Sequence, residues 1–315
     1  MLNIQHILQS FPIPIYRKLD EYFSKEEVNI NQLEEIRIRV GRPIFVRNNR
    51  KNIALEYIVK PEEILETLQH ICDNSIYSYQ TQICQGFITM RGGHRVGITG
   101  NVVMKEGKVS NINYISSLNF RIAKQILGCS NKILPYVLKV EDNSVYNTLI
   151  VSPPGAGKTT ILRDLIRRIS NGIEQLQFQG INVGVVDERG EIAAMYRGIP
   201  QNDIGIRTDV LDNVSKEIGI HMLIRSMSPQ VIVADEIGSK EDVQAIQKAV
   251  CSGVKGIFTA HGENMEDMKR NLAMEILLQN HIWDRIIFLQ KDFEVGKVYE
   301  FQPLEKQYIS MAKKS

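Results

Sequence analysis

The chain has 315 residues, of which 43% are hydrophobic and 23% charged, and its formal net charge at pH 7 is +2. This composition is that of an ordinary globular protein in water. The small net charge gives no electrostatic reason to expect a nucleic-acid partner. Because single hydrophobic cores stop growing at roughly 250–300 residues, we expect two domains rather than one.

Four cysteines, Cys72, Cys84, Cys129 and Cys251, are scattered along the chain without a CxxC pair or an accompanying histidine cluster. This spacing argues against zinc and against a disulfide framework, and it is typical of a reducing cytosol. The first residues lack the basic start and apolar core of a signal peptide. No apolar run approaches the roughly 20 residues that span a bilayer. We therefore expect a cytoplasmic protein with no transmembrane segment.

Residues 1–140 are predicted to form an N-terminal α+β domain. Residues 34–55 alternate apolar and polar side chains around a Gly-Arg-Pro turn, which predicts two short strands. Residues 60–72 begin with a lysine and a proline and then repeat apolar residues at helical spacing, which predicts a helix. Residues 93–104 and 109–124 are predicted to be further strands of a curved, antiparallel sheet.

Residues 141–315 follow a different pattern, in which short apolar runs alternate with amphipathic helices. The runs are TLIVS, INVGVVD, VIVAD, GIFTA and RIIFL. Buried strands that alternate with helices predict an α/β fold whose parallel sheet is covered on both faces. Ligands of such folds bind beyond the carboxyl ends of the strands, and the polar clusters considered next lie at such ends.

The first cluster is the stretch LIVSPPGAGKTTILRDLI, which resembles a phosphate-binding loop between a strand and a helix. The loop pattern is Gly, four residues and Gly-Lys-Ser/Thr, and Ser152 stands at the first glycine, a change that a negative φ would tolerate. Lys158 would contact the β- and γ-phosphates, and the Thr159 hydroxyl would bind Mg²⁺. The predicted nucleotide-binding residues are Ser152, Pro153, Pro154, Gly155, Ala156, Gly157, Lys158, Thr159 and Thr160.

Asp235 and Glu236 follow the run VIVA directly. One of these acids could hold Mg²⁺ through a water molecule, and the other could polarise the attacking water. We assign the first role to Asp235 and the second to Glu236. The alternative is a solvated pair of acids at a strand end. His261 follows the next apolar run, where a neutral imidazole could bond the γ-phosphate, although a single histidine is more often structural.

Asp187, Glu188 and Glu191 form a second acidic cluster around Arg189. Three carboxylates so close in sequence repel one another unless a cation lies among them, and Mg²⁺ or Arg189 could supply that charge. A charged surface turn is the alternative.

The order of these motifs resembles the type II/type IV secretion ATPase superfamily. VVDERGE is similar to its aspartate box, VIVADEIGSKEDVQAI to its Walker B segment and FTAHGEN to its histidine box. Over roughly residues 30–290, RPIFV, RGGHRVGITG, SLNFRIAK, VGVVDERGEIAA and ADEIGSKEDV together resemble the stage III sporulation AA family. The histidine box departs from the superfamily pattern, because Gly262-Glu263-Asn264 replaces the usual Thr-Asn.

The resemblance implies an N-terminal domain joined to a RecA-like, P-loop ATPase domain in a homo-oligomeric, hexameric ring. It also implies ATP and Mg²⁺ as cofactors, with Glu188 and Glu236 as the aspartate-box and Walker B glutamates and His261 as the histidine-box residue. The implied partners are membrane-embedded sporulation channel proteins between mother cell and forespore, which the ring would meet at the cytoplasmic face of a membrane.

ATP hydrolysis in such rings uses an arginine that neutralises charge in the transition state, often from a neighbouring subunit. We select Arg95 first, because its segment best matches the superfamily's N-terminal domain, and Arg225 second. The remaining candidates are Arg91, Arg121 and Arg207.

The sequence therefore predicts an Mg²⁺-dependent ATPase that acts as the motor of a membrane-associated secretion-type channel complex. A nucleic-acid translocase is one alternative, against which no helix-turn-helix, zinc finger or aromatic strand-binding groove is apparent. A nucleotide-gated scaffold that does not hydrolyse ATP is the other, and Ser152 makes it conceivable.

Overall fold

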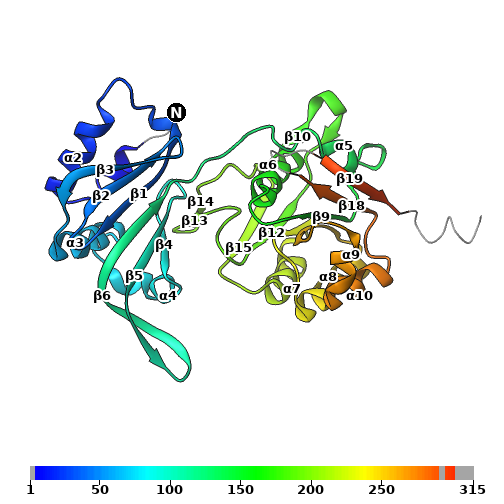
Figure 1. The fold of residues 1–315 in the computed structure, drawn as a ribbon. Helices are drawn as coiled ribbons and strands as arrows, with labels where there is room; N and C mark the ends of the chain where they lie inside the picture. Colours follow the sequence, from blue (N-terminus) through cyan, green and yellow to red (C-terminus); the bar gives the residue numbers. More distant parts are fainter. Residues whose placement is uncertain (1–3, 291–294, 302–315) are drawn as a thin grey trace, which may run out of the picture. The chain divides into compact units, whose positions relative to one another are not determined.

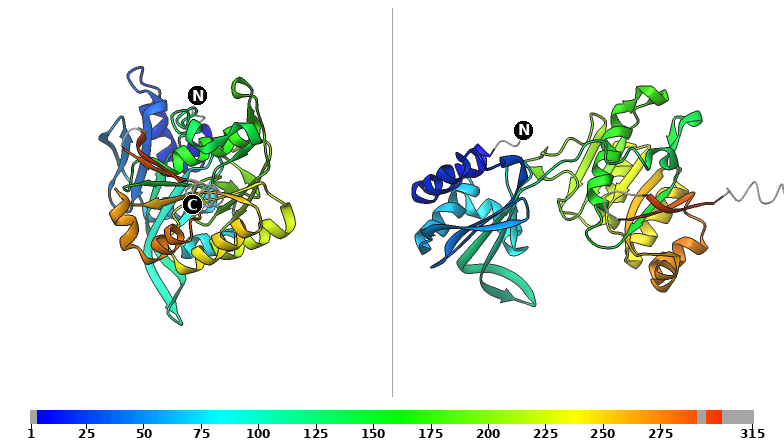
Figure 2. Two further views of the ribbon diagram at one scale, coloured as in Figure 1. Left: turned by 90° about the vertical axis from the view of Figure 1, so that its right-hand side faces the viewer. Right: turned by 45° about the horizontal axis from the view of Figure 1, so that its top comes forward.

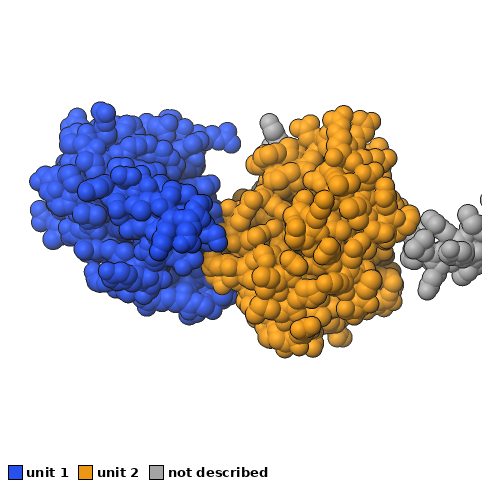
Figure 3. Space-filling model, turned by 90° about the horizontal axis from the view of Figure 1, so that it is seen from below, with its two compact units in different colours: residues 1–124, 194–201 blue, residues 125–193, 202–315 orange. Residues whose placement is uncertain are grey.

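The computed structural model describes residues 4–290 and 295–301. These residues divide into two compact units, which Figure 3 colours separately. Of the described residues, the first unit contains 4–124 and 194–201, and the second contains 125–193, 202–290 and 295–301. The chain therefore leaves the second unit after residue 193 and returns to it at residue 202.

This division differs from a boundary at residue 140, because residues 125–140 belong to the second unit. The buried Ser130 donates hydrogen bonds from its backbone N–H (3.0 Å) and its hydroxyl (2.6 Å) to the carboxylate of Asp164. Gln125 donates from its side chain to the carbonyl of Asp203 at 2.7 Å. Polar contacts that local sequence patterns do not indicate therefore attach this segment to the second unit.

The first unit is built on a six-stranded antiparallel sheet in the order β3-β2-β1-β6-β5-β4. Its strands are β1 (Leu33–Arg39), β2 (Pro43–Asn48), β3 (Lys51–Ile58), β4 (Phe87–Thr89), β5 (Arg95–Lys105) and β6 (Lys108–Arg121). Its helices are α1 (Gln5–Leu8), α2 (Ile13–Phe23), α3 (Pro61–Ile71) and α4 (Gln80–Cys84). The long hairpin of β5 and β6 is prominent in Figure 1.

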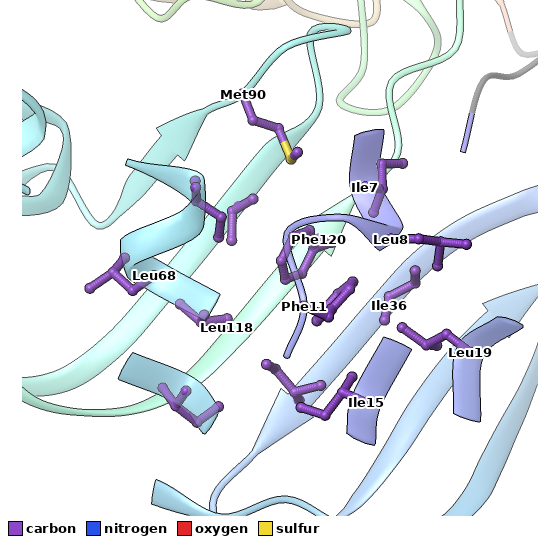
Figure 4. Packing of buried hydrophobic residues seen from close by; sticks show 14 of the residues in the cluster. Ile7, Leu8, Phe11, Ile15, Leu19, Ile36, Leu68, Met90, Leu118 and Phe120 are labelled. Atoms are coloured by element: carbon purple, nitrogen blue, oxygen red, sulfur yellow. The ribbon is translucent and has the colours of Figure 1, made fainter. Parts of the chain in front are cut away.

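One face of this sheet carries the hydrophobic core of the first unit (Figure 4). Along β6, Leu118 and Phe120 are fully buried, whereas Arg121 is exposed. The ring of Phe120 meets that of Phe11 with centroids 4.5 Å apart. This alternation of buried and exposed residues is what an antiparallel sheet with one covered face requires.

The second unit contains a seven-stranded sheet in the order β15-β12-β16-β17-β9-β18-β19. All neighbouring pairs are parallel except β18 and β19, which are antiparallel. The strands are β9 (Thr148–Ser152), β12 (Val183–Asp187), β15 (Thr208–Asp212), β16 (Val231–Ala234), β17 (Lys255–His261), β18 (Arg285–Leu289) and β19 (Val295–Glu300).

Helices cover both faces of the parallel sheet (Figures 1 and 2). Helix α6 (Lys158–Asn171) lies on one face, and α7 (Lys216–Met227), α8 (Lys240–Cys251) and α10 (Leu272–Gln279) lie on the other. Two shorter helices are α5 (Leu134–Val137) and α9 (Met265–Arg270). Across the described ranges, no helix combines the length and the apolar character needed to cross a membrane.

Residues 194–201 form a hairpin of the first unit, made of β13 (Met195–Tyr196) and β14 (Ile199–Pro200). Asp73, which follows α3, accepts a hydrogen bond from the Tyr196 hydroxyl at 2.7 Å and forms an ion pair with Arg197 at 2.6 Å. The side-chain carbonyl of Gln201 accepts the N–H of Gly92 at 2.8 Å. The first unit is therefore completed by a segment that follows its main body by about 70 residues.

Candidate active site

The sheet order of the second unit brings the predicted motifs to one edge. Strands β12, β16, β17 and β9 are consecutive neighbours, all parallel. Their carboxyl ends carry, in that order, Asp187, Asp235, His261 and the loop after Ser152. In the register of β17 with β9, His261 lies directly opposite Ser152. Parallel pairing alone thus gathers four segments that are far apart in the sequence.

The loop between β9 and α6 has the backbone form that a phosphate-binding loop needs. Gly155 and Gly157 adopt φ values of +75° and +91°, in the left-handed region that favours glycine. A Cβ added at Gly155 would meet no atom within 4 Å, so the backbone conformation rather than lack of space requires glycine there. Helix α6 begins at Lys158, and its N-terminal N–H groups adjoin the loop.

Lys158 is folded into this loop and is only 5% exposed. Its ammonium donates to the carbonyl oxygens of Ser152 (3.0 Å) and Pro153 (3.3 Å) and to the Ser152 hydroxyl (3.2 Å). Burial lowers the pKa of Lys158, while the carboxylates of Asp235 and Glu236 act in the opposite direction. The serine at the first position of the loop therefore adds an oxygen to the site that holds this lysine.

The Asp235 carboxylate lies between two threonine hydroxyls. Thr159 donates to its Oδ2 and Thr259 to its Oδ1. Burial raises the pKa of Asp235, and the two hydroxyl hydrogen bonds oppose that rise. A hydroxyl and a carboxylate are oxygen ligands of the kind that Mg²⁺ prefers, so Thr159 and Asp235 are the residues that could hold this ion.

Glu236 is linked to Lys158 through His261. His261 Nε2 lies 3.0 Å from Glu236 Oε1, and its Nδ1 lies 3.1 Å from Lys158 Nζ. Because an ammonium has only protons to offer, Nδ1 accepts and the ring proton is on Nε2, which donates to Glu236. The second oxygen of Glu236 forms an ion pair with Arg189. Glu236 itself has a φ of +53°, an uncommon backbone value for a residue other than glycine.

The members of the second acidic cluster have different roles. Asp187 is 2% exposed, and its carboxylate accepts the backbone N–H groups of Glu191 (2.8 Å), Ile192 (3.1 Å) and Ala193 (2.9 Å). Asp187 therefore holds its own loop in shape. Glu188, in contrast, is exposed and pairs with Lys216 at the start of α7.

Glu188, Glu191, Asp235 and Glu236 line one small hollow at the carboxyl edge of the sheet. The structure therefore brings the two predicted catalytic glutamates, Glu188 and Glu236, to the same place. Their roles in catalysis remain predictions.

Of the arginines named from the sequence, the two that belong to the second unit, Arg225 and Arg207, do not lie at this edge. Helix α7 runs antiparallel to the strands, so Arg225 in its last turn lies at the amino-terminal edge of the sheet, away from the loop. Arg207 immediately precedes β15 and lies at that same edge. Arg95 belongs to the first unit, where its guanidinium lies 4.2 Å from the centroid of the Phe87 ring.

Arg91 and Arg121 also belong to the first unit, and both are exposed. Arg121 lies opposite Arg95 in the register of β5 and β6.

The structure adds residues that motif reading does not find. Thr259 lies two residues before His261, so both side chains point to the same side of β17. This spacing is the only sign in the sequence that Thr259 belongs to the site.

Arg163 of α6 donates hydrogen bonds to the carbonyl oxygens of Ile192 (2.9 Å) and Glu191 (2.7 Å) and so supports the loop of the second acidic cluster. Lys216, the partner of Glu188, is brought in by tertiary folding, and its local sequence carries no sign of the contact.

Solved structures of ATPases share this architecture. The ATPase DotB of Legionella pneumophila superposes with a TM-score of 0.61, covering 96% of this chain and 84% of that chain at 17% identity. The pilus retraction motor PilT, solved with bound ADP, gives a TM-score of 0.55 over 91% of this chain and 87% of that chain at 15% identity. The chain thus has the RecA-like fold of the secretion ATPases, which confirms the predicted fold class.

Sequence comparison narrows this class to one family. The model of the family described as "Sporulation stage III, protein AA" matches residues 5–304, and the chain belongs to this family. The stage III sporulation protein AA of Bacillus subtilis (strain 168) is 39% identical over 279 residues, which cover 89% of each chain. The predicted resemblance is therefore confirmed at the level of the family.

Proposed function

We propose that the chain is an Mg²⁺-dependent ATPase, and that it acts as the motor of a membrane-associated channel complex during sporulation. The observation that carries the proposal is the connected set of polar groups at the carboxyl edge of the parallel sheet. Thr159 is bonded to Asp235, and Lys158 is linked through His261 to Glu236.

The residues present fit a nucleoside triphosphate. Lys158 is a buried ammonium whose acceptors in the loop are uncharged oxygens, which a phosphate group would complement better. The left-handed glycines allow the loop's N–H groups to face an anion. Thr159 and Asp235 would hold Mg²⁺, which when bound would neutralise part of the phosphate charge.

The side chains beyond the phosphate loop would carry the hydrolytic step. Glu236 would accept a proton from water, and His261 contacts one of its carboxylate oxygens. Glu188, which lines the same hollow, would orient the water or the phosphate from the other side. If Lys158 moved from its uncharged acceptors to a phosphate group, it would also lose its contact with His261 Nδ1. Because His261 contacts Glu236, nucleotide binding would then change the surroundings of the Glu236 carboxylate.

Assembly and location are proposed from the relatives. A hexameric ring that meets membrane-embedded channel proteins from the cytoplasmic side suits a chain with the fold of a pilus motor. The name of the Bacillus relative supports a role in sporulation, and we place the channel between mother cell and forespore.

ATP hydrolysis by the purified chain tests the proposal. We expect turnover that needs Mg²⁺, and we expect Lys158→Ala to lose ATP affinity and at least 90% of the activity, because it removes the ammonium in the phosphate loop. The exposed Lys248, in the last turn of α8, gives the matched control Lys248→Ala, which should behave as the parent chain. Unchanged turnover in folded Lys158→Ala would refute the phosphate-loop interpretation.

A further inference from the structure

Thr259 contacts the end of β16 through both its side chain and its backbone. It is fully buried within β17. Its hydroxyl donates to Asp235 Oδ1 and accepts the backbone N–H of Glu236 at 2.8 Å. Its carbonyl oxygen accepts the N–H of Ile237, also at 2.8 Å. One residue of β17 thus bonds three consecutive residues of the neighbouring segment.

These bonds hold a turn that is unfavourable by itself. Glu236 has a φ of +53°, a conformation that persists in a residue with a side chain only when surrounding contacts impose it. The backbone N–H of Glu236 donates its hydrogen bond to the Thr259 hydroxyl. The second oxygen of Asp235 is held by Thr159, so one threonine hydroxyl holds each oxygen of that carboxylate.

An ordinary strand threonine provides the contrast. Thr148 in the adjacent strand β9 is also fully buried, but its hydroxyl donates only to the carbonyl of Tyr146, at 2.9 Å. It lies at the amino-terminal edge of the sheet, away from the acids. Thr259 therefore has a connection to the site that burial in a strand does not explain.

We propose that Thr259 is a positioning residue for ATP hydrolysis, an inference that rests on the function proposed above. Its hydroxyl fixes the orientation of the Asp235 carboxylate and the backbone of Glu236. Because Thr259 and His261 lie on the same strand, β17 holds Glu236 at two points, by its backbone N–H and by its carboxylate. Loss of the hydroxyl should then affect the chemical step more than the binding of ATP.

The test compares the full chain with Thr259→Val, which keeps the shape and removes the hydroxyl, and with Thr259→Ser, which restores the hydroxyl. For Thr259→Val we expect kcat to fall roughly 10–100-fold, the usual range when a supporting contact of a metal site is lost. The KM for ATP should stay within about threefold. We expect Thr259→Ser to recover at least half of the activity and Thr148→Val to behave as the parent.

A second readout needs no nucleotide. Hydrogen exchange should become at least about tenfold faster at the Glu236 amide in Thr259→Val, because this amide loses its acceptor, and should be unchanged in Thr259→Ser and Thr148→Val. The inference is refuted if Thr259→Val turns over within twofold of the parent, if Thr259→Ser is as impaired as Thr259→Val, or if the variant loses ATP binding. A parent chain without ATPase activity would instead refute the proposed function, while amide exchange would still measure the positioning.

Discussion

At the scale of single residues, the serine in place of the first loop glycine has a structural explanation. Ser152 is fully buried at the end of β9, and its hydroxyl donates to the Pro153 carbonyl at 3.0 Å while it accepts from Lys158. It is absent from the residues with positive φ, so the backbone there has no need of glycine. The replacement therefore changes the contacts of the lysine and leaves the course of the loop intact.

The two glutamates lead to a prediction at the same scale. Glu236→Gln and Glu188→Gln should each retain ATP binding and lose most hydrolysis, roughly 10²–10⁴-fold, because an amide cannot act as a base. Binding of a labelled nucleotide and single-turnover hydrolysis measure the two effects separately. Glu241→Gln, an exposed residue in the first turn of α8, is the matched control.

Normal hydrolysis in both glutamine variants would transfer the catalytic role to Asp235 or Glu191. Asp187 is a poor substitute, because its carboxylate is occupied by three backbone N–H groups of its own loop. A variant that no longer binds ATP would point instead to a damaged magnesium site.

At the scale of elements, the strands that are buried on both faces of the sheet can be predicted from the sequence. The apolar runs that become β9, β12, β16, β17 and β18 are recognisable because no charged side chain interrupts them. Strand β15, TDVLD, was not predicted, since it lies at the edge of the sheet, is half-buried throughout and carries two aspartates. Edge strands lack the continuous apolar signal of central ones.

The same limit applies to the candidate site. Each motif that follows a buried strand could be found in the sequence by itself. The order of the strands in the sheet, which the structure gives, brings these motifs together. For Thr259 the only sequence signal is its position two residues before His261, and this signal is weak because a threonine inside a strand is expected for its β-propensity alone. Lys216 and the hairpin 194–201 depend on contacts with residues distant in sequence, such as Glu188 and Asp73. Local sequence patterns do not predict contacts between residues that are far apart in the chain.

His94, in the first unit, gives a prediction for the dependence of stability on pH. It is 4% exposed, and its Nδ1 accepts the N–H of Ala123 at 3.1 Å. Burial, and to a lesser extent the charge of His6, lower the pKa of His94 from 6.5 to about 4. Below pH 6.5 the unfolded chain therefore binds a proton that the folded chain does not, so stability falls as the pH is lowered towards 4.

We expect the free energy of unfolding to fall by about 2 kcal/mol between pH 7 and pH 5 from this group alone. Urea unfolding followed by circular dichroism measures it. The His94→Gln variant should have a correspondingly flatter dependence on pH, and His70→Gln, at an exposed histidine, should keep the parent's slope. Equal slopes in all three chains would contradict the assignment.

At the scale of the whole molecule, the positions of the arginines bear on assembly. Arg225 lies at the edge of the sheet opposite the phosphate loop, so it cannot serve the loop of its own unit. Arg95 belongs to the first unit, whereas the loop between β9 and α6 belongs to the second. An arginine supplied by a neighbouring subunit is the arrangement that a ring provides.

We therefore expect specific activity to rise with protein concentration as subunits associate. Arg95→Ala should be nearly inactive, and mixing it with Lys158→Ala, which still carries Arg95, should restore part of the activity. Arg95→Lys tests the need for a planar guanidinium, and the exposed Arg17→Ala is the control. No rescue, activity that is independent of dilution and a monomeric mass with ATP bound would together overturn the ring.

The hairpin 194–201 has a consequence for how the protein is made. A ribosome delivers Asp73 long before its partners, since Tyr196 follows it by 123 residues and Arg197 by 124. At about 5–20 residues per second, the interval is roughly 6–25 seconds. Throughout that time the nascent first unit lacks the hairpin of β13 and β14 and the contacts of that hairpin with Asp73. A translational pause between residues 125 and 193 would prolong this incomplete state. A chaperone or a protease would then bind the nascent chain while its first unit is incomplete.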